Sequence, residues 1–275
     1  MNSLINTLMN DLKKLTETSI THIVSYSGGL GSAITADMVI KKYGVDNVIL
    51  LFADTLVEDQ DLYRFNNDLI GRLGCRFIRI AEGRTPWQVF NDRRYIGNTR
   101  VDPCSEVLKR KFIKKWIFEN FTPINCVIWI GIDSTEEHRL KPVIVKNKPY
   151  VYRSILIENN VFLTTEYKNR WCDINNIRIP RLYDYGFAHN NCGGFCVKAG
   201  LAQFKKLYEY LPDIYLENEM QEELLMRTHP RTKPFLRKQV KGVLRYMTMK
   251  EYRLKYLDSL TDDESLDFGG CGCAL

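Results

Sequence analysis

The sequence lacks the features of membrane, fibrous and disordered proteins. No apolar run in its 275 residues approaches the roughly 20 needed to cross a bilayer. It has no internal repeat, no low-complexity tract and no long linker. With 45% hydrophobic and 26% charged residues, its composition is that of an ordinary globular protein, which excludes a fully disordered or collagen-like chain.

A secretory signal is also not apparent, because the first residues, MNSLINTLMNDLKKL, mix acidic and basic side chains with apolar ones. They predict an amphipathic helix over 2–16. We therefore expect a cytoplasmic protein that does not contact a membrane. In that compartment, structural disulfides among the eight cysteines are the less favoured interpretation.

A modest basic excess, +6, permits a nucleic-acid or phosphate-bearing partner without requiring one. Residues 231–255 concentrate nine Lys or Arg with a single acidic residue among them, interleaved with Phe235, Tyr246 and Tyr252. Such a stretch could bind a nucleic-acid backbone. The alternative is a solvated surface balanced by the acidic residues of 212–223.

The first half of the chain alternates apolar strands with amphipathic helices. Strands are expected over 22–26, 47–54, 75–80 and 126–132, and helices over 32–43, 59–73, from 86 onward and over 104–120. This alternation predicts an α/β fold, a parallel five-stranded Rossmann-like sheet flanked by helices. Ligands of such sheets bind beyond the carboxyl ends of the strands.

The pattern changes after residue 140. Short β-type runs are expected over 143–166, loops over 167–197, and helices near 198–210, 213–227 and 248–258. We therefore expect a nucleotide-binding core in residues 1–140. Residues 141–275 would form a smaller α+β C-terminal region that carries substrate and metal sites.

A glycine-rich loop, SGGLGS at 27–32, lies between the first expected strand and the helix after it. Glycines allow backbone amides to approach an anion closely, and the following helix adds unpaired N–H groups and a positive dipole end. Ser27 and Ser32 add hydroxyl groups. The loop is not a Walker loop, because no Gly-Lys-Ser/Thr closes it. It predicts a phosphate cradle; the alternative is a glycine turn used only for tight packing.

Five segments in order resemble one family. SYSGGLGSA resembles the SGGxDS PP-loop of the ATP pyrophosphatases (adenine nucleotide α-hydrolases), and the other four resemble their phosphoadenosine phosphosulfate (PAPS) reductase branch: FADTLVEDQDLYRFNNDL, DPCSEVLKRKFIKKW, IGIDSTEEHRL and IPRLYDYGFAHNNCGGFC. The resemblance covers roughly residues 20–200. It implies an enzyme that binds ATP with Mg²⁺ and cleaves it between the α and β phosphates.

The resemblance implies a nucleotide site at the strand ends. Its expected residues are Ser25, Tyr26, Ser27, Gly28, Gly29, Gly31, Ser32, Ala53, Asp54, Thr55, Gly131, Asp133 and Glu136. Asp54 and Asp133 are candidates for Mg²⁺, which few protein ligands hold beside phosphates. One residue departs from the family pattern: the Asp of SGGxDS is Gly31 here, and Asp37 or Asp54 could compensate.

Three residues are candidates for catalysis. Lys109 and Arg139 could stabilise the leaving pyrophosphate. Lys109 could instead belong to a solvated helix face, and Arg139 could simply pair with Glu136 three residues earlier. Cys104 begins a basic helix, where the thiol pKa is lowered, so it could carry sulfur or act as a nucleophile; the alternative is a small buried side chain.

Two cysteine pairs, Cys192 with Cys196 and Cys271 with Cys273, could form a four-thiolate metal site. Spacing alone does not separate Zn²⁺ from a [4Fe–4S] cluster. Relatives in the resembling branch carry iron–sulfur clusters at the matching pair, which favours iron. The alternative is two unrelated thiol pairs.

The sequence thus predicts an enzyme that adenylates an acceptor and releases pyrophosphate, with sulfur transfer from a donor to a nucleic acid or a small molecule as a plausible outcome. A PAPS reductase is the first alternative, although the chain lacks the short redox-active cysteine tail typical of those enzymes. A non-catalytic nucleotide-binding sensor or partner subunit is the second alternative, and Gly31 favours it.

Overall fold

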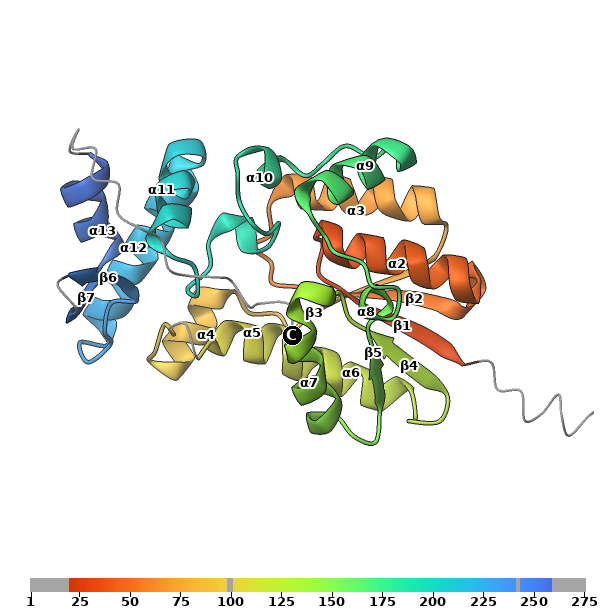
Figure 1. The fold of residues 1–275 in the computed structure, drawn as a ribbon. Coiled ribbons are helices and arrows are strands. Elements are labelled where there is room, and N and C mark those ends of the chain that lie inside the picture. Colours follow the sequence, from red (N-terminus) through yellow and green to blue (C-terminus); the bar gives the residue numbers. More distant parts are fainter. Residues whose placement is uncertain (1–19, 98–100, 241–242, 259–275) are drawn as a thin grey trace, which may run out of the picture.

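The computed structural model describes residues 20–97, 101–240 and 243–258 (Figure 1). Its centre is a sheet of five parallel strands in the order β3-β2-β1-β4-β5, as predicted. The strands are β1 Thr21–Tyr26, β2 Val48–Asp54, β3 Arg76–Ala81, β4 Cys126–Trp129 and β5 Val151–Arg153. The helix expected over 2–16 lies outside the described residues.

Local sequence signals set the boundaries of the helices in the first half, which are α2 Leu30–Tyr43, α3 Gln60–Leu73 and α4 Pro86–Arg93. Gly44 and Gly74 end α2 and α3 with positive φ angles of 85° and 65°. The Asp59 side chain caps the start of α3. Thr85 and Gln88 form a capping box at the start of α4.

The basic helix predicted over 104–120 is present as one continuous run. It comprises α5 Pro103–Ser105, a π-helical segment Glu106–Lys111 and α6 Phe112–Asn120. π-helical segments are rare and concentrate at functional sites. Lys109 and Arg110 both lie on this one.

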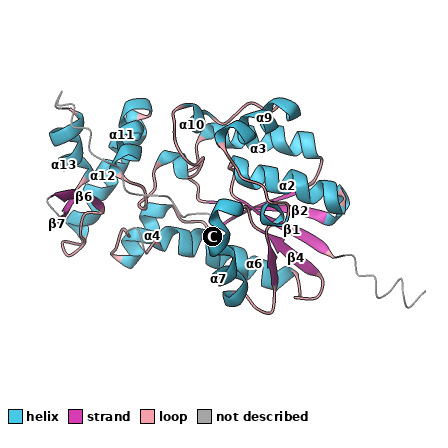
Figure 2. Ribbon diagram, in the orientation of Figure 1, coloured by secondary structure: helices cyan, strands magenta, loops and turns pink. Residues whose placement is uncertain are grey.

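Helices cover both faces of the sheet (Figures 1 and 2). Val24 and Leu50 face a core with α2, α3, α8 Ile155–Glu158 and α9 Thr165–Asn175. Ile23 packs on the opposite face against Ile117 of α6. Consecutive strand residues therefore point to opposite, fully buried faces, which explains the continuous apolar strand sequences.

The strands predicted over 143–166 are largely wrong, whereas the loops predicted over 167–197 are present in part, between short helices. Val143 lies in the helix α7 Leu140–Lys146, the only strand is β5, and the loop-rich region contains α9 and α10 Arg181–Asp184. The preference of β-branched residues for strands depends on context, and here tertiary packing places Val143 in a helix beside β5. The Thr164 side chain instead accepts from Tyr167 N and starts α9.

A second core contains the C-terminal elements: α11 Leu201–Tyr210, α12 Pro212–Thr228, β6 Leu236–Val240, β7 Val243–Met247, α13 Met249–Tyr252 and a π-helical segment Arg253–Leu257. β6 and β7 form an antiparallel hairpin. Phe195, Phe204 and Phe235 pack edge to face in this core, and Phe90 of α4 joins them.

The sheet continues past residue 140 through β5, and Trp171 of α9 lies in the core of the sheet. Leu182 is the first residue of the later chain in the second core. We therefore propose that the division expected near 140 falls near residue 180. Among the described residues, no helix is long and apolar enough to cross a membrane.

Glu222 of α12 is a buried carboxyl group inside the second core, with no exposed surface. Its Oε2 accepts from the backbone N–H of Met249 at 2.6 Å, at the start of α13, and its Oε1 has no partner within the described chain. Burial raises the pKa of Glu222 to about 8, with Glu219 and Glu251 adding repulsion. The folded protein therefore holds this proton at neutral pH.

This proton makes stability depend on pH. Because the folded pKa of Glu222 is raised, its contribution is fully present below the unfolded value of 4.5 and is lost as pH rises through about 8. We expect the free energy of unfolding to fall by up to about 1.4 kcal/mol per pH unit in that window. Glu222→Gln should flatten this slope in urea titrations from pH 5 to 8. Glu223→Gln, which alters the half-buried neighbour that pairs with Lys250, should retain it; equal slopes in wild type and Glu222→Gln would contradict the assignment.

Candidate active site

The glycine-rich loop follows β1 and leads into α2, as the sequence predicts. The Ser32 hydroxyl accepts from the N–H of Ser27 at 3.1 Å and donates to the carbonyl of Gly29 at 2.9 Å, which closes the loop on itself. Gly28 has a φ of +82°, and a Cβ there would lie 2.7 Å from Leu62 Cδ1. Glycine is therefore required at that position, and the loop is a tight, internally bonded turn.

Gly131, which follows β4, packs directly on the loop. A Cβ on Gly131 would lie 3.3 Å from both Gly31 C and Ser32 N. The β1–β4 pairing brings these segments together. Two backbones thus approach at the carboxyl edge of the sheet, where a parallel α/β protein binds its ligand.

Gly31, the departure from the family pattern, is covered by Leu163. A Cβ on Gly31 would lie 3.1 Å from Leu163 Cδ1, the end of a flexible side chain. Leu163 is held in turn by its N–H, which donates to Asp133 Oδ2 at 2.9 Å. Leu163 therefore contacts the space beside Gly31 with its side chain and the Asp133 carboxylate with its backbone.

A side chain from α10, far along the chain, forms a hydrogen bond to the end of the loop. The buried Tyr183 Oη accepts from the N–H of Leu30 at 3.2 Å, at the first residue of α2. Burial raises the pKa of Tyr183 to about 12, so it remains a neutral phenol. One of the N–H groups at the start of the helix is thus satisfied by a side chain from 153 residues further along the chain.

Two consecutive asparagines hold the loop carbonyls. Asn190 Nδ2 donates to the carbonyl of Gly28 at 3.0 Å. The amide of Asn191, oriented so that both of its ends are satisfied, donates to the carbonyl of Ser27 at 3.2 Å. Asn190 is 1% exposed, and its Oδ1 has no partner within the described chain. One buried acceptor therefore remains beside the loop.

A cavity of about 1080 Å³ opens in front of the loop. The predicted site residues that line it are Ser25, Tyr26, Ser27, Gly29, Gly31, Ser32, Ala53, Lys109, Gly131, Asp133, Glu136 and Arg139. Seven Lys or Arg side chains line it against four carboxylates. The cavity therefore suits an anionic ligand.

The four carboxylates of this cavity are already engaged. Asp102 binds Arg110, Glu106 binds Lys111, and Glu136 binds Arg139. Asp133 accepts from Thr135 and Leu163; burial raises the pKa of Asp133, but these hydrogen bonds outweigh it and hold the pKa below its usual value. Asp133 is thus ionised at neutral pH.

The two carboxylates considered as substitutes for the missing family Asp have other roles. Asp54 is 1% exposed and does not line the cavity; its carboxylate accepts from Arg79 Nε at 2.7 Å and from Tyr63 Oη. Asp37 accepts from Lys41 and from Trp171 Nε1 on α9. Both carboxylates therefore stabilise the fold.

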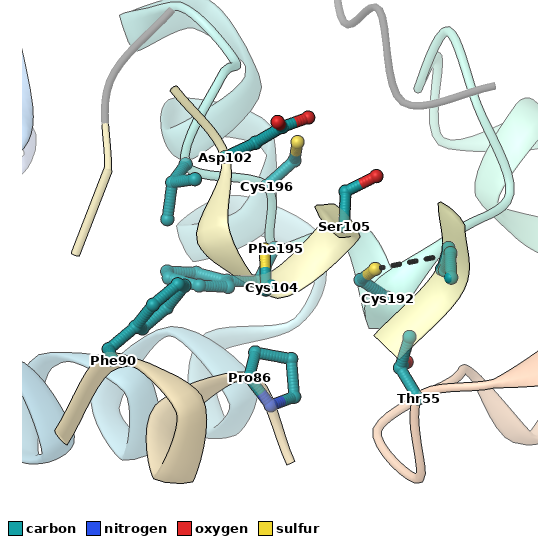
Figure 3. A pocket seen from close by; sticks show the side chains of 11 residues that line it. Thr55, Pro86, Phe90, Asp102, Cys104, Ser105, Cys192, Phe195 and Cys196 are labelled. Atoms are coloured by element: carbon teal, nitrogen blue, oxygen red, sulfur yellow. Dashed lines mark hydrogen bonds between the residues drawn. The ribbon is translucent and has the colours of Figure 1, made fainter. Parts of the chain in front are cut away.

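A second, small pocket of about 20 Å³ adjoins the first and is lined by four further predicted residues, whereas Gly28 and Asp54 line neither cavity (Figure 3). Cys104, Cys192 and Cys196 line it, together with Thr55. Lys109 lines both cavities, and its Nζ lies 3.8 Å from Cys192 Sγ. The cysteine pocket and the anion cavity therefore share a wall.

Glu58, which the sequence analysis did not single out, contacts three residues that line this pocket. Its fully buried carboxylate accepts from Thr55 Oγ1 at 2.8 Å and from the N–H of Cys192, and lies 3.5 Å from Lys109 Nζ. A Thr-x-x-Glu spacing after a strand end was the available signal. It was not decisive, because Lys109 and Cys192 are distant in the sequence.

The turn that carries the first cysteine pair is unusual. Cys192, Gly193 and Gly194 have φ angles of 53°, 58° and 86°, all in the left-handed region. A non-glycine residue seldom adopts this conformation, and such residues cluster at functional sites. The turn directs the N–H of Cys192 at Glu58.

A complete metal site is not formed by the described part of the chain, where no three His, Cys, Asp or Glu side chains are arranged to hold an ion. Cys271 and Cys273 lie outside the described residues. Cys75, Cys126 and Cys172 are buried in the α/β core, and burial raises the pKa of Cys126 and of Cys172 to about 11. Those two thiols are therefore protonated and unreactive.

The basic stretch 231–255 contains the β6–β7 hairpin. Phe235 and Tyr252 are buried in the second core, which leaves Tyr246 as the exposed aromatic residue of the three. Arg253 pairs with Glu219 of α12 at 2.8 Å. Only one of these three aromatic rings is therefore exposed for stacking with bases. The Arg253–Glu219 pair also shows that the acidic helix neutralises part of the basic stretch.

Comparisons with known proteins found one matching family model and several similar solved structures. The family model of the phosphoadenosine phosphosulfate reductase domain matches residues 21–195. One similar solved structure is PAPS reductase from Candida auris in a phosphate complex: 14% identity, TM-score 0.43, covering 68% of this chain and 90% of that one. Another is the predicted subunit of tRNA methyltransferase from Methanocaldococcus jannaschii: 16% identity, TM-score 0.37, covering 56% and 76%. A search of curated proteins found no match.

The contact between Gly131 and the loop can be tested directly. Gly131→Ala should displace the loop backbone at a cost of about 1–3 kcal/mol, which corresponds to a roughly 5- to 150-fold loss of ATP affinity in calorimetric titration. Gly71→Ala is the matched control, because a Cβ there meets nothing within 4 Å. An unchanged affinity in Gly131→Ala would show that the ligand does not use this loop.

Proposed function

This chain belongs to the phosphoadenosine phosphosulfate reductase domain family, and we propose that it is an ATP-dependent PP-loop enzyme that adenylates an acceptor and releases pyrophosphate. The observation that carries the proposal is the junction of Gly131 with the glycine loop at the floor of a cation-rich cavity. A phosphate chain needs closely approaching backbone amides and positive side chains, and this cavity offers both.

Lys109 and Arg139 are proposed to stabilise charge on the departing pyrophosphate. Lys109 is 12% exposed and lies on the π-helical segment, between Glu58 and the cavity. Arg139 is 18% exposed and is held by Glu136. Positive groups that are fixed in advance of the reaction lower its barrier more than mobile ones do, because they need no reorganisation.

Mg²⁺ would be held in this cavity by Asp133, a carboxylate that lines it and is engaged by hydrogen bonds rather than by a cation. Such an ion would neutralise phosphate charge, and it needs only one or two carboxylates from the protein. We propose that Asp133 takes the place of the family carboxylate that Gly31 lacks. The position of Leu163, in contact with both residues, supports this assignment.

The cysteine pocket is proposed to serve sulfur transfer, with Cys192, Cys196, Cys271 and Cys273 holding a [4Fe–4S] cluster or Zn²⁺. Cys104 lines the same pocket from the start of α5. Because that pocket shares Lys109 with the anion cavity, sulfur chemistry there would take place beside an activated acceptor. Two observations support the proposal of sulfur transfer from a donor and of a metal cluster. One is the adjacency of the two cavities, and the other is the membership of the family.

Two other functions remain distinguishable. The family model is named for sulfonucleotide reduction, so thiol-dependent release of sulfite from PAPS would identify a reductase. Gly31 favours a nucleotide-binding module without catalysis, which would bind ATP and release no pyrophosphate.

Pyrophosphate release from ATP and Mg²⁺ is the primary test. Lys109→Met should lower the rate by about 10²-fold, whereas Lys115→Met, on the same helix but outside both cavities, should leave it nearly unchanged. ATP binding is followed in parallel as an increase in melting temperature. Binding without any pyrophosphate, with acceptors of several classes supplied, would reject the enzyme in favour of the binding module.

Metal content tests the cysteine site separately. After anaerobic purification we expect bound iron with labile sulfide and a broad visible absorption band, both lost in Cys192→Ala. Cys75→Ala, at a buried thiol of the α/β core, should retain them. Stoichiometric zinc without that band would assign the four cysteines to a structural zinc site, and equal metal in both variants would exclude the site.

A further inference from the structure

The large cavity extends well beyond the glycine loop. It passes around the carboxyl edge of the sheet to a region lined by Ile113 and Lys114 of α6, Val143 and Lys146 of α7, and Tyr152 of β5. We call this region the α6–α7 arm. α6 packs on the sheet face opposite α2, so the arm and the loop belong to different sides of the fold. In Figure 1, α6 and α7 lie below the strands and α2 lies above them.

The volume of the cavity lies at the upper end of the range for small-molecule sites. Sites for single small molecules measure about 300–1,000 Å³, and this cavity reaches about 1080 Å³. A nucleotide whose phosphates contact the loop leaves the arm available for a second molecule.

The charge of the arm indicates what that molecule carries. Every carboxylate that lines the cavity is already engaged by a cation or by hydrogen bonds, as described above. Lys114 and Lys146 have no acidic partner anywhere in the described chain, and the Nζ of Lys114 lies only over the Phe118 ring, at 5.2 Å. Two positive charges therefore remain without a counterion in the arm, which favours an anionic group there.

The apolar residues of the arm indicate that the second molecule has an apolar or aromatic part beside its anionic group. Ile113, Val143 and the half-buried Tyr152 ring lie among the two lysines. An aromatic ring with flanking cations is the combination that accepts a base and its phosphates.

We propose that the α6–α7 arm is the acceptor subsite and binds the phosphate groups of a second, nucleotide-based substrate while ATP occupies the glycine loop. The inference rests on the proposed function, of which it names the acceptor class. Phosphates of a free nucleotide and of a nucleic-acid strand share this chemistry.

The test uses the full-length protein with the loop saturated by α,β-methylene-ATP. A fluorescein-labelled single-stranded oligonucleotide of about eight nucleotides is titrated by anisotropy at several salt concentrations. Lys114→Gln with Lys146→Gln should weaken its binding roughly tenfold and reduce the salt slope by about 0.7 for each lysine removed. The matched controls are Lys115→Gln on α6 and Lys141→Gln on α7, which do not line the cavity.

The outcomes separate the possible sources and the possible failures. Displacement of the oligonucleotide by thymidine monophosphate at similar concentration would identify a free nucleotide as the acceptor, and resistance would identify a strand. Equal binding in the double variant and its controls, or no binding of either probe, would overturn the proposal.

Loss of analogue binding in the double variant would also overturn it, because the arm would then belong to the ATP site. Failure of the wild type to bind the analogue would reject the proposed function, while the oligonucleotide titration would still report on the arm.

Discussion

The candidate active site depends on one backbone contact, the approach of Gly131 to the loop at Gly31 and Ser32. β1 pairs with both β2 and β4, so the residues that follow the central strands meet at one edge of the sheet. A side chain at Gly131 would lie 3.3 Å from the loop backbone. Because both segments are glycine at this contact, they pack directly, and the cavity forms in front of them.

We propose that Asp133 substitutes for the carboxylate that the loop lacks at Gly31. Leu163 covers Gly31, and its N–H is held by Asp133. The proposed carboxylate lies on the segment after β4 rather than at the start of α2. The chemistry of a substituted motif therefore depends on the neighbouring side chains as well as on the motif itself.

A series of hydrogen bonds and one ion pair connects the anion cavity with the cysteine pocket. Asn190 and Asn191 bond the loop carbonyls, and the next residue, Cys192, bonds Glu58, which also contacts Lys109. A conformational change at Cys192 would therefore be passed to the glycine-rich loop through the adjacent residues Asn190 and Asn191. In the same way, an anion that displaces Lys109 would alter the surroundings of the Cys192 thiol.

The sequence by itself determined the α/β core, the loop and most of its expected lining residues, because these depend on local signals such as apolar periodicity and helix-ending glycines like Gly44. It misassigned Val143 and its neighbours as strand, because strand propensity is a context-dependent preference that tertiary packing overrides. Tertiary structure alone decided the role of Glu58, the engagement of Asp54 by Arg79, and the burial of Phe235. Each depends on partners far away in the chain, and no periodicity or spacing encodes which distant side chain will occupy a given space.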